Sequence, residues 1–168
     1  MKLYFAPAAC SLSPHIVLRE VGASFDLEQV DNRQKKTKSG ADFWTINPKG
    51  YVPVLELDTG ARLTEGPAIV QYIADMNPAA GLVPPAGSME RYRVMEWLNF
   101  VTSELHKSFG PMFNPATPDT YKAILRENIG QTFRLARKAS FRQAILDGRQ
   151  IQCCRRLSLH RGALVALC

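Results

Sequence analysis

The sequence lacks the features that mark membrane, metal-binding and phosphate-binding proteins. No apolar run approaches the roughly 20 residues that a membrane-spanning helix needs, and the N-terminus shows no basic leader followed by an apolar core. The 3 histidines are scattered and two of the 4 cysteines are adjacent, so no metal-ligand spacing is present. A glycine-rich phosphate loop is also absent. We expect a cytoplasmic protein with no metal and no membrane partner.

Excess basic charge is missing from most of the chain, although the formal net charge is +6. Residues 1–133 hold 13 Lys and Arg against 14 Asp and Glu, whereas residues 134–168 hold 8 basic groups against Asp147 alone. A nucleic-acid interface needs basic side chains gathered on one folded face. Because the excess lies entirely in the tail, we expect no nucleic-acid partner.

Strand and helix patterns alternate in the first 77 residues. Apolar spacing, a proline suited to a first helical turn and an Asp-Thr-Gly hairpin signal predict a β-α-β unit followed by a β-β-α unit. The expected elements are strands at 2–6, 25–30, 52–57 and 61–66 and helices at 11–21 and 67–76.

The composition changes after residue 77. A Pro-, Gly- and Ala-rich stretch at 78–88 predicts a linker. Beyond it, apolar residues recur with a period near that of an α-helix in residues 89–113, and 119–135 offers a second helix. We therefore expect an α/β domain at 1–77 followed by an all-helical one.

Cys10 is the first candidate for chemistry. It lies between an expected strand and the start of an expected helix, where free backbone amides and the helix dipole stabilise an anion, so we expect a depressed thiol pKa. A small buried apolar cysteine is the alternative interpretation. Ser13 gives a Cys-x-x-Ser pattern, which resembles a thiol oxidoreductase motif without its second cysteine.

Two dipeptides at element ends are further candidates. Val52-Pro53 precedes a strand, where a proline is either an edge residue or a cis peptide in a tight turn. A cis bond would turn the Val52 backbone outward to pair with an extended peptide. Glu65-Gly66 precedes a helix whose first amides could receive a carboxylate, although the motif taken alone favours a solvated turn.

Four motifs together resemble one family. The runs CSLSPHIVLRE, INPKGYVPVLELDTG, LTEGPAIVQYIAD and EWLNFVTSELHK, in this order and spacing, are similar to the bacterial beta-class glutathione S-transferases over nearly all of residues 1–133. The resemblance implies an α/β thioredoxin-like N-terminal domain followed by an all-α C-terminal domain. It also implies glutathione as the cosubstrate and a homodimer as the assembly.

The resemblance implies a binding site for the middle of glutathione. Cys10 would lie against the glutathione sulfur and could form a mixed disulfide with it, and Ser11 supplies a neighbouring hydroxyl. Val52, before a Pro53 that we predict to be cis, would pair with the cysteinyl part. Of the four thiols, Cys10 is expected to be the most reactive.

The two ends of glutathione would be held by other matching positions. Glu65 would bind the γ-glutamyl ammonium, Gly66 its carboxylate, and Lys35 would lie near the glycyl carboxylate. From the helical domain the matching residues are Asn99, Ser103, Glu104, Leu105, His106 and Lys107.

Three of these helical positions, 99, 103 and 106, share one face of an α-helix by their i+4 and i+3 spacing. His106 and Lys107 match residues that approach the thiol across the domain cleft, and a histidine there can donate a hydrogen bond to a thiolate and lower its pKa. The expected catalytic residues are Cys10 and His106.

The implied activity is conjugation of the glutathione thiol to a small electrophile, which the sequence does not identify. The resemblance also allows thiol-disulfide exchange or peroxide reduction through a mixed disulfide at Cys10. Two alternatives stay open: an inactive truncated fragment, and a glutathione-binding module without turnover.

The family pattern stops after about Phe133. Reading the tail one nucleotide later, with allowed codons for Arg149 to His160, permits DKFSVADAYLYI, which contains a Ser-x-x-Asp capping box. We interpret residues 134–168 as a frameshift product, which would leave the helical domain, 89–133, incomplete. Residues 134–168 carry 9 charged side chains and offer little apolar surface to offset the entropy lost on ordering. We therefore expect that residues 134–168 form no native helical subdomain.

Overall fold

A mixed β-sheet forms the centre of the N-terminal half in the computed structural model, which describes the backbone of residues 1–146 and the side chains of residues 1–138. The strand order is β3-β2-β1-β4-β5. β1 runs parallel to β2, and the other neighbouring pairs are antiparallel. The strands are β1 (Lys2–Phe5), β2 (Asp26–Asp31), β3 (Lys36–Thr37), β4 (Val54–Glu56) and β5 (Arg62–Thr64).

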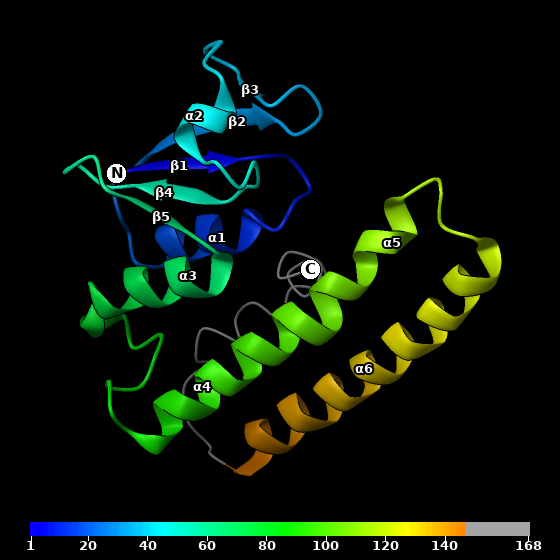
Figure 1. The fold of residues 1–168 in the computed structure, drawn as a ribbon. Helices are drawn as coiled ribbons and strands as arrows, with labels where there is room; N and C mark the ends of the chain where they lie inside the picture. Colours follow the sequence, from blue (N-terminus) through cyan, green and yellow to red (C-terminus); the bar gives the residue numbers. More distant parts are fainter. Residues whose placement is uncertain (147–168) are drawn as a thin grey trace.

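Helices cover both faces of this sheet (Figure 1). α1 (Leu12–Glu20) and α3 (Gly66–Asp75) lie together on one face, and the short α2 (Phe43–Ile46) lies on the other. Because successive strand residues point to opposite faces, Leu3 of β1 packs with α1 and α3, whereas Tyr4 packs with Phe43 of α2. The β-α-β and β-β-α order and the thioredoxin-like fold class are confirmed.

The second half is helical. A small apolar core of Leu105, Leu125 and Ile129 joins the segment around residue 105 to the helix that contains residues 125 and 129. Its elements are η1 (Pro78–Ala80), α4 (Met89–Phe100), the π-helix η2 (Val101–His106), η3 (Lys107–Phe109), α5 (Gly110–Phe113) and α6 (Asp119–Leu146). In Figure 1, α4 and α6 run side by side below the sheet.

Arg91 fastens the helical part to the α/β part. Its guanidinium is buried and donates two hydrogen bonds to the Asp75 carboxylate on α3, at 2.7 and 2.6 Å. It donates further bonds to Gln71 and to the Pro84 carbonyl. Beside this ion pair, Leu98 of α4 joins the apolar cluster that contains α1 and α3. The two parts therefore share one packed boundary.

The elements that the sequence did not predict include the two-residue strand β3, the four-residue helix α2, the short η1 within the expected linker and the π-helix η2. The expected break near Phe133 is not an element boundary, because α6 continues from Asp119 to Leu146 instead of ending near Leu135. The remainder of the tail, residues 147–168, lies outside the described residues. Of the helices up to residue 146, none has the length and apolar character needed to cross a membrane.

Candidate functional site

Cys10 lies in the turn between β1 and α1, where the sequence places it. Its partly buried thiol donates a hydrogen bond to the carbonyl oxygen of Val52, with a sulfur–oxygen distance of 3.3 Å. This contact joins the start of α1 to the segment that precedes β4, 42 residues away.

The pKa of the Cys10 thiol is raised above its ordinary value, so the expectation of a depressed pKa is wrong. Desolvation by burial is the largest cause; the backbone amides of Cys10 and Ser11 lower the pKa, and the negative charge of Glu65 raises it. Burial outweighs the backbone amides because a thiolate loses more hydration than two amides restore. Cys10 is therefore a thiol at neutral pH.

Ser11 is turned away from this surface. Its fully buried hydroxyl donates to the Ala6 carbonyl and accepts from the Ala6 amide, each at 3.1 Å. The hydroxyl thus closes the turn after β1 and has no free orientation toward a ligand. The Ser11 backbone amide, in contrast, faces the Cys10 sulfur.

The Val52-Pro53 peptide is cis, as predicted. Val52 is buried, and its carbonyl is occupied by Cys10. Within residues 1–138, no hydrogen bond is formed by the Val52 amide.

Glu65 is an exposed carboxylate directly before α3, and it adopts a left-handed φ of 70°. A non-glycine residue in this region costs roughly 1–2 kcal/mol and is often found at functional sites. The carboxylate accepts a hydrogen bond from Lys49 Nζ at 2.7 Å, and Lys49 also donates to Thr64 Oγ1 at 3.0 Å. A Cβ atom at Gly66 would meet nothing within 4 Å, so the space beside it is open.

Lys35 contacts the chain at Gly50, the residue after Lys49. Its Nζ donates to the Gly50 carbonyl at 2.8 Å and lies 5.8 Å from the ring centre of Trp44 and 5.5 Å from that of Tyr51. Lys35 also has a left-handed φ, of 54°. Neither aromatic ring was singled out from the sequence.

The expected helical residues do not all lie on a regular α-helix. Residues 101–106 form a π-helix, which has more residues per turn than an α-helix, so the α-helical i+3 relation between Ser103 and His106 does not hold there. The Leu105 side chain is fully buried in the helical core. Asn99, Ser103, Glu104 and Lys107 are exposed and His106 is half-buried.

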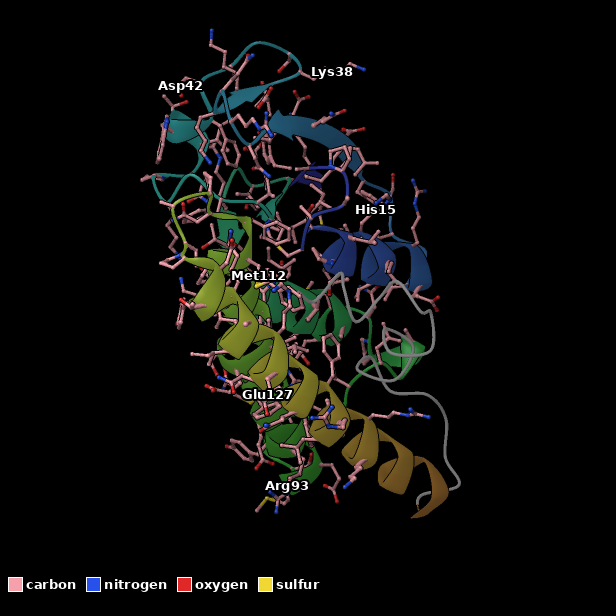
Figure 2. All side chains as sticks on the ribbon, turned by 90° about the vertical axis from the view of Figure 1, so that its right-hand side faces the viewer. His15, Lys38, Asp42, Arg93, Met112 and Glu127 are labelled. Atoms are coloured by element: carbon pink, nitrogen blue, oxygen red, sulfur yellow. The ribbon has the colours of Figure 1, made fainter. Side chains whose placement is uncertain are left out.

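Figure 2 shows where this helical segment lies relative to the sheet. Met112 of α5 is at the end of the helical part that adjoins the α/β part, whereas Arg93 of α4 is at the far end. The π-helix connects these two ends. Among the described residues no hydrogen bond joins Cys10 to His106.

Comparisons with known proteins agree with this architecture. Residues 1–75 match the family described as glutathione S-transferase, N-terminal domain. The glutathione S-transferase GstA of Escherichia coli O157:H7 is 47% identical over 139 residues, which cover 83% of this chain and 69% of that protein. The chain belongs to the glutathione S-transferase family.

Solved structures of other transferases share the fold of this one. A sphingomonad glutathione S-transferase complexed with glutathione is 51% identical, with a TM-score of 0.80 over 83% of this chain and 70% of that chain. The bacterial beta-class enzyme of Sphingomonas chungbukensis is 36% identical, with a TM-score of 0.85 over 99% of this chain and 97% of that chain. The beta-class resemblance is thereby confirmed.

His106 of this transferase has a pKa below its ordinary value. Desolvation by burial is the main cause and the positive charge of Lys107 adds to it. The imidazole is therefore neutral at neutral pH. Its Nδ1 atom is buried and has no hydrogen-bond partner within the described part of the chain.

One hollow on the transferase surface lies away from these residues. It has a volume of about 380 Å³, contains none of the expected site residues, and is lined by Phe5, Leu27, Glu28, Gln29, Lys38 and Ser39.

Proposed function

We propose that this chain binds glutathione around the segment Lys49–Pro53 and transfers its sulfur to an electrophile. One observation carries the proposal: the segment is contacted by a thiol, a carboxylate and an ammonium that lie far apart in the sequence. Cys10 contacts it at Val52, Glu65 at Lys49, and Lys35 at Gly50. Glutathione presents the complementary groups, with a thiol between an amino acid end and a carboxylate end.

Each end of glutathione finds a charged partner. Glu65 accepts hydrogen bonds from the γ-glutamyl ammonium, which replaces Lys49 there. The first amides of α3, at the open space beside Gly66, receive the γ-glutamyl carboxylate. Lys35 binds the glycyl carboxylate, and the Val52 amide pairs with the cysteinyl carbonyl.

Cys10 acts as a hydrogen-bond donor to the glutathione sulfur. Its raised pKa keeps the proton on the Cys10 thiol at neutral pH, and a donor beside a second sulfur favours that sulfur as a thiolate. The glutathione thiolate then uses a lone pair to form a carbon–sulfur bond with the electrophile, and the leaving group departs with the bonding pair. Retaining the Cys10 proton disfavours thiol-disulfide exchange, which needs a Cys10 thiolate.

Neutral His106 donates a hydrogen bond through its ring N–H to the glutathione thiolate, and the proton that the glutathione thiol loses goes to solvent. The lowered pKa of His106 keeps the imidazole neutral at neutral pH. Asn99, Ser103, Glu104 and Lys107 are the exposed neighbours on the same helical segment. They provide polar groups that can contact glutathione from the helical part.

Conjugation of glutathione to 1-chloro-2,4-dinitrobenzene, followed at 340 nm, tests the activity. The wild-type chain should be retained on glutathione resin and turn over, whereas Glu65→Gln should lose retention. Retention without turnover would indicate a binding module. Failure to bind glutathione would leave only the inactive fragment.

We also propose that the chain is a cytoplasmic homodimer. Exposed apolar side chains recur on α4 at Met89, Tyr92 and Met95, and Met76 at the end of α3 is exposed as well. Apolar patches of this kind mark interfaces between proteins. Sedimentation equilibrium tests the dimer, and cell fractionation tests the location.

A further inference from the structure

We propose that Trp44 and Tyr51 are positioning residues that hold the Lys35 ammonium against the Gly50 carbonyl, so that the site selects ligands ending in a carboxylate. This inference rests on the proposed glutathione site and names two residues that decide its specificity. Neither ring needs to touch the ligand. Their role is to fix one cation.

The Lys35 ammonium has partners on three sides. One N–H donates to the Gly50 carbonyl at 2.8 Å, and the ring centres of Trp44 and Tyr51 lie 5.8 and 5.5 Å away. Within residues 1–138 no carboxylate forms an ion pair with Lys35. An ammonium that donates one N–H to a carbonyl still has two N–H groups for an anion. The two aromatic rings attract the Lys35 ammonium but carry no negative charge, so the ammonium keeps its full charge for a ligand.

The backbone of Lys35 is fixed as well. Its carbonyl accepts from the Phe43 amide at 2.8 Å, and its amide donates to the Asp31 carbonyl at 2.8 Å. The left-handed φ of 54° is a conformation in which glycine would be unstrained. A side chain is nevertheless present there, which agrees with a function for that side chain.

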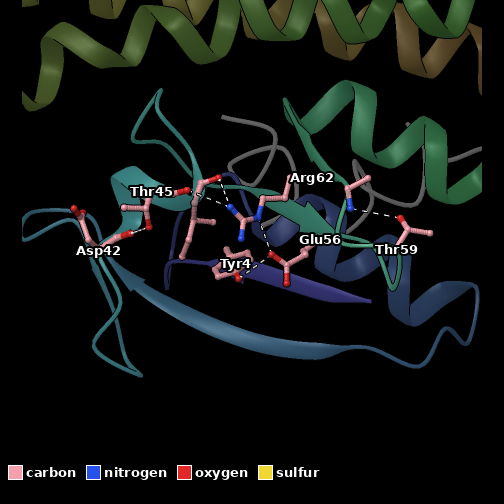
Figure 3. A network of polar contacts seen from close by, with 8 residues as sticks. Tyr4, Asp42, Thr45, Glu56, Thr59 and Arg62 are labelled. Atoms are coloured by element: carbon pink, nitrogen blue, oxygen red, sulfur yellow. Dashed lines mark hydrogen bonds and ion pairs between the residues drawn. The ribbon is translucent and has the colours of Figure 1, made fainter.

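Trp44 is held from both ends of its short helix. At the start, Asp42 accepts from the Trp44 amide at 3.0 Å. At the end, Arg62 donates to the carbonyls of Thr45 and Ile46 at 3.2 and 3.3 Å (Figure 3). Arg62 is itself paired with Glu56 at 2.7 Å, and Glu56 accepts from the Tyr4 hydroxyl at 3.3 Å. This polar network anchors α2 to the sheet and so fixes the indole beside Lys35.

Gly50 allows the indole to approach. Its φ is +68°, and an added Cβ would lie 2.5 Å from an atom of the Trp44 ring. The indole therefore packs directly on the backbone whose carbonyl binds Lys35. The glycine, the indole and the ammonium form one unit, although half of the Trp44 surface and 71% of the Tyr51 surface remain exposed.

A glycyl carboxylate is the group that this unit fits. It is the one end of glutathione that carries an anion and no ammonium. A ligand in which that carboxylate is esterified gains nothing from Lys35. Selection then depends on the position of the ammonium, because a charge-assisted hydrogen bond requires a short, aligned approach.

The test compares binding of glutathione with binding of its glycyl ethyl ester by calorimetry. Trp44→Leu and Tyr51→Leu should each raise the dissociation constant for glutathione about three- to tenfold, as expected for loss of one cation–π contact. Binding of the ester should stay unchanged. In turnover, KM for glutathione should rise with kcat unchanged. Trp44→Phe and Tyr51→Phe should retain most of the selectivity.

Tyr121→Leu on α6 is the matched control, because Tyr121 is 48% exposed and distant in sequence from the site. Circular dichroism shows that each variant is folded. NMR of the free protein gives an independent readout: the ε-methylene signal of Lys35 should be shifted upfield by the rings and return toward its ordinary position in Trp44→Leu.

The inference would be overturned if the ratio of the dissociation constants for the ester and for glutathione were the same in Trp44→Leu as in the wild type. It would also be overturned if the Lys35 ε-methylene signal of the wild type were not shifted upfield. If the Phe variants lost selectivity as fully as the Leu variants, the rings would act only by their exact shape and the cation–π role would be wrong. Tight glutathione binding in any of these cases leaves the proposed function standing. Absence of glutathione binding by the wild type would reject both.

Discussion

The Cys10 thiol donates to the carbonyl oxygen of Val52 across 3.3 Å, and that carbonyl belongs to the segment proposed to pair with glutathione. The contact ties the start of α1 to a residue 42 positions away and leaves the thiol sulfur beside that segment.

Alkylation of Cys10 by iodoacetamide should be slow at pH 7. Its rate should rise with a midpoint above the ordinary thiol pKa, because burial raises the pKa of Cys10. Peptide mapping identifies the labelled residue, and Cys10→Ser supplies the background from Cys153, Cys154 and Cys168, which lie outside the described residues. A midpoint below pH 8 would contradict the raised pKa.

The same group affects stability at alkaline pH. Since the folded pKa is raised, the contribution of Cys10 is fully present below the ordinary thiol value of about 9 and is lost as pH rises through the folded pKa. Urea unfolding of wild type and Cys10→Ser should therefore converge or cross above pH 9. A constant difference from pH 7 to pH 10 would argue against this linkage.

Arg91→Leu should lower the free energy of unfolding by about 1–3 kcal/mol, because it removes charge-assisted hydrogen bonds at the boundary between the two parts. Asp75 has a lowered pKa, first because of the Arg91 hydrogen bonds. The stabilisation is present above the ordinary Asp value of 3.8 and lost as pH falls through the folded pKa.

Arg93→Leu on the same helix is the control for this measurement. Arg93 pairs with Glu96, but both side chains are largely exposed. Solvent screens an exposed pair of this kind, so it contributes little to stability. Equal losses in the two variants would show that Arg91 does not fasten the parts together.

Glu65→Gln should weaken glutathione binding about 10- to 100-fold, because it removes a charge-assisted hydrogen bond worth roughly 1.5–3 kcal/mol. The amide keeps the shape of the carboxylate but not its charge. Calorimetry measures the change, and Glu90→Gln, an exposed carboxylate at the start of α4, is the matched control. Undiminished affinity in Glu65→Gln would remove Glu65 from the site.

His106 should titrate below the ordinary histidine pKa of 6.5, because burial and the Lys107 charge both disfavour the imidazolium. Lys107→Met should raise its pKa, and NMR of the imidazole ring follows both. Because the folded pKa is lowered, stability is retained above pH 6.5 and falls as the pH drops through the folded pKa. His15, which also has a lowered pKa from burial and Arg19, must be assigned separately.

The sequence predicts the position of Cys10 but not its ionisation. Its place between a strand and a helix follows from local apolar spacing and from Pro14 in the first helical turn. The raised pKa depends on burial, and burial depends on tertiary contacts that no local pattern records. The direction of the Ser11 hydroxyl was missed for the same reason, since its partner is the backbone of Ala6.

The helical residues show a second limit of sequence reasoning. The spacing of Asn99, Ser103 and His106 predicts one face only if the helix is regular. The hydrogen-bonding pattern of a π-helix leaves no composition signal, so the register change at Val101 could not be seen. Tyr51 could have been noticed as an aromatic residue directly after Gly50 and close to Pro53, whereas Trp44 lies six residues before that glycine and meets it only in the fold.

The position of β1 in the sheet affects how the chain folds while it is being synthesised. β1 is made first, yet one of its two edges pairs with β4, whose last residue is Glu56. At a translation rate of about 5–20 residues per second, that edge stays open for roughly 3–10 seconds after β1 is complete. During this interval β1 lacks its neighbour β4. A ribosome-bound chaperone that shields short apolar segments should therefore raise the yield of folded protein, and slowing translation before residue 56 should lower it.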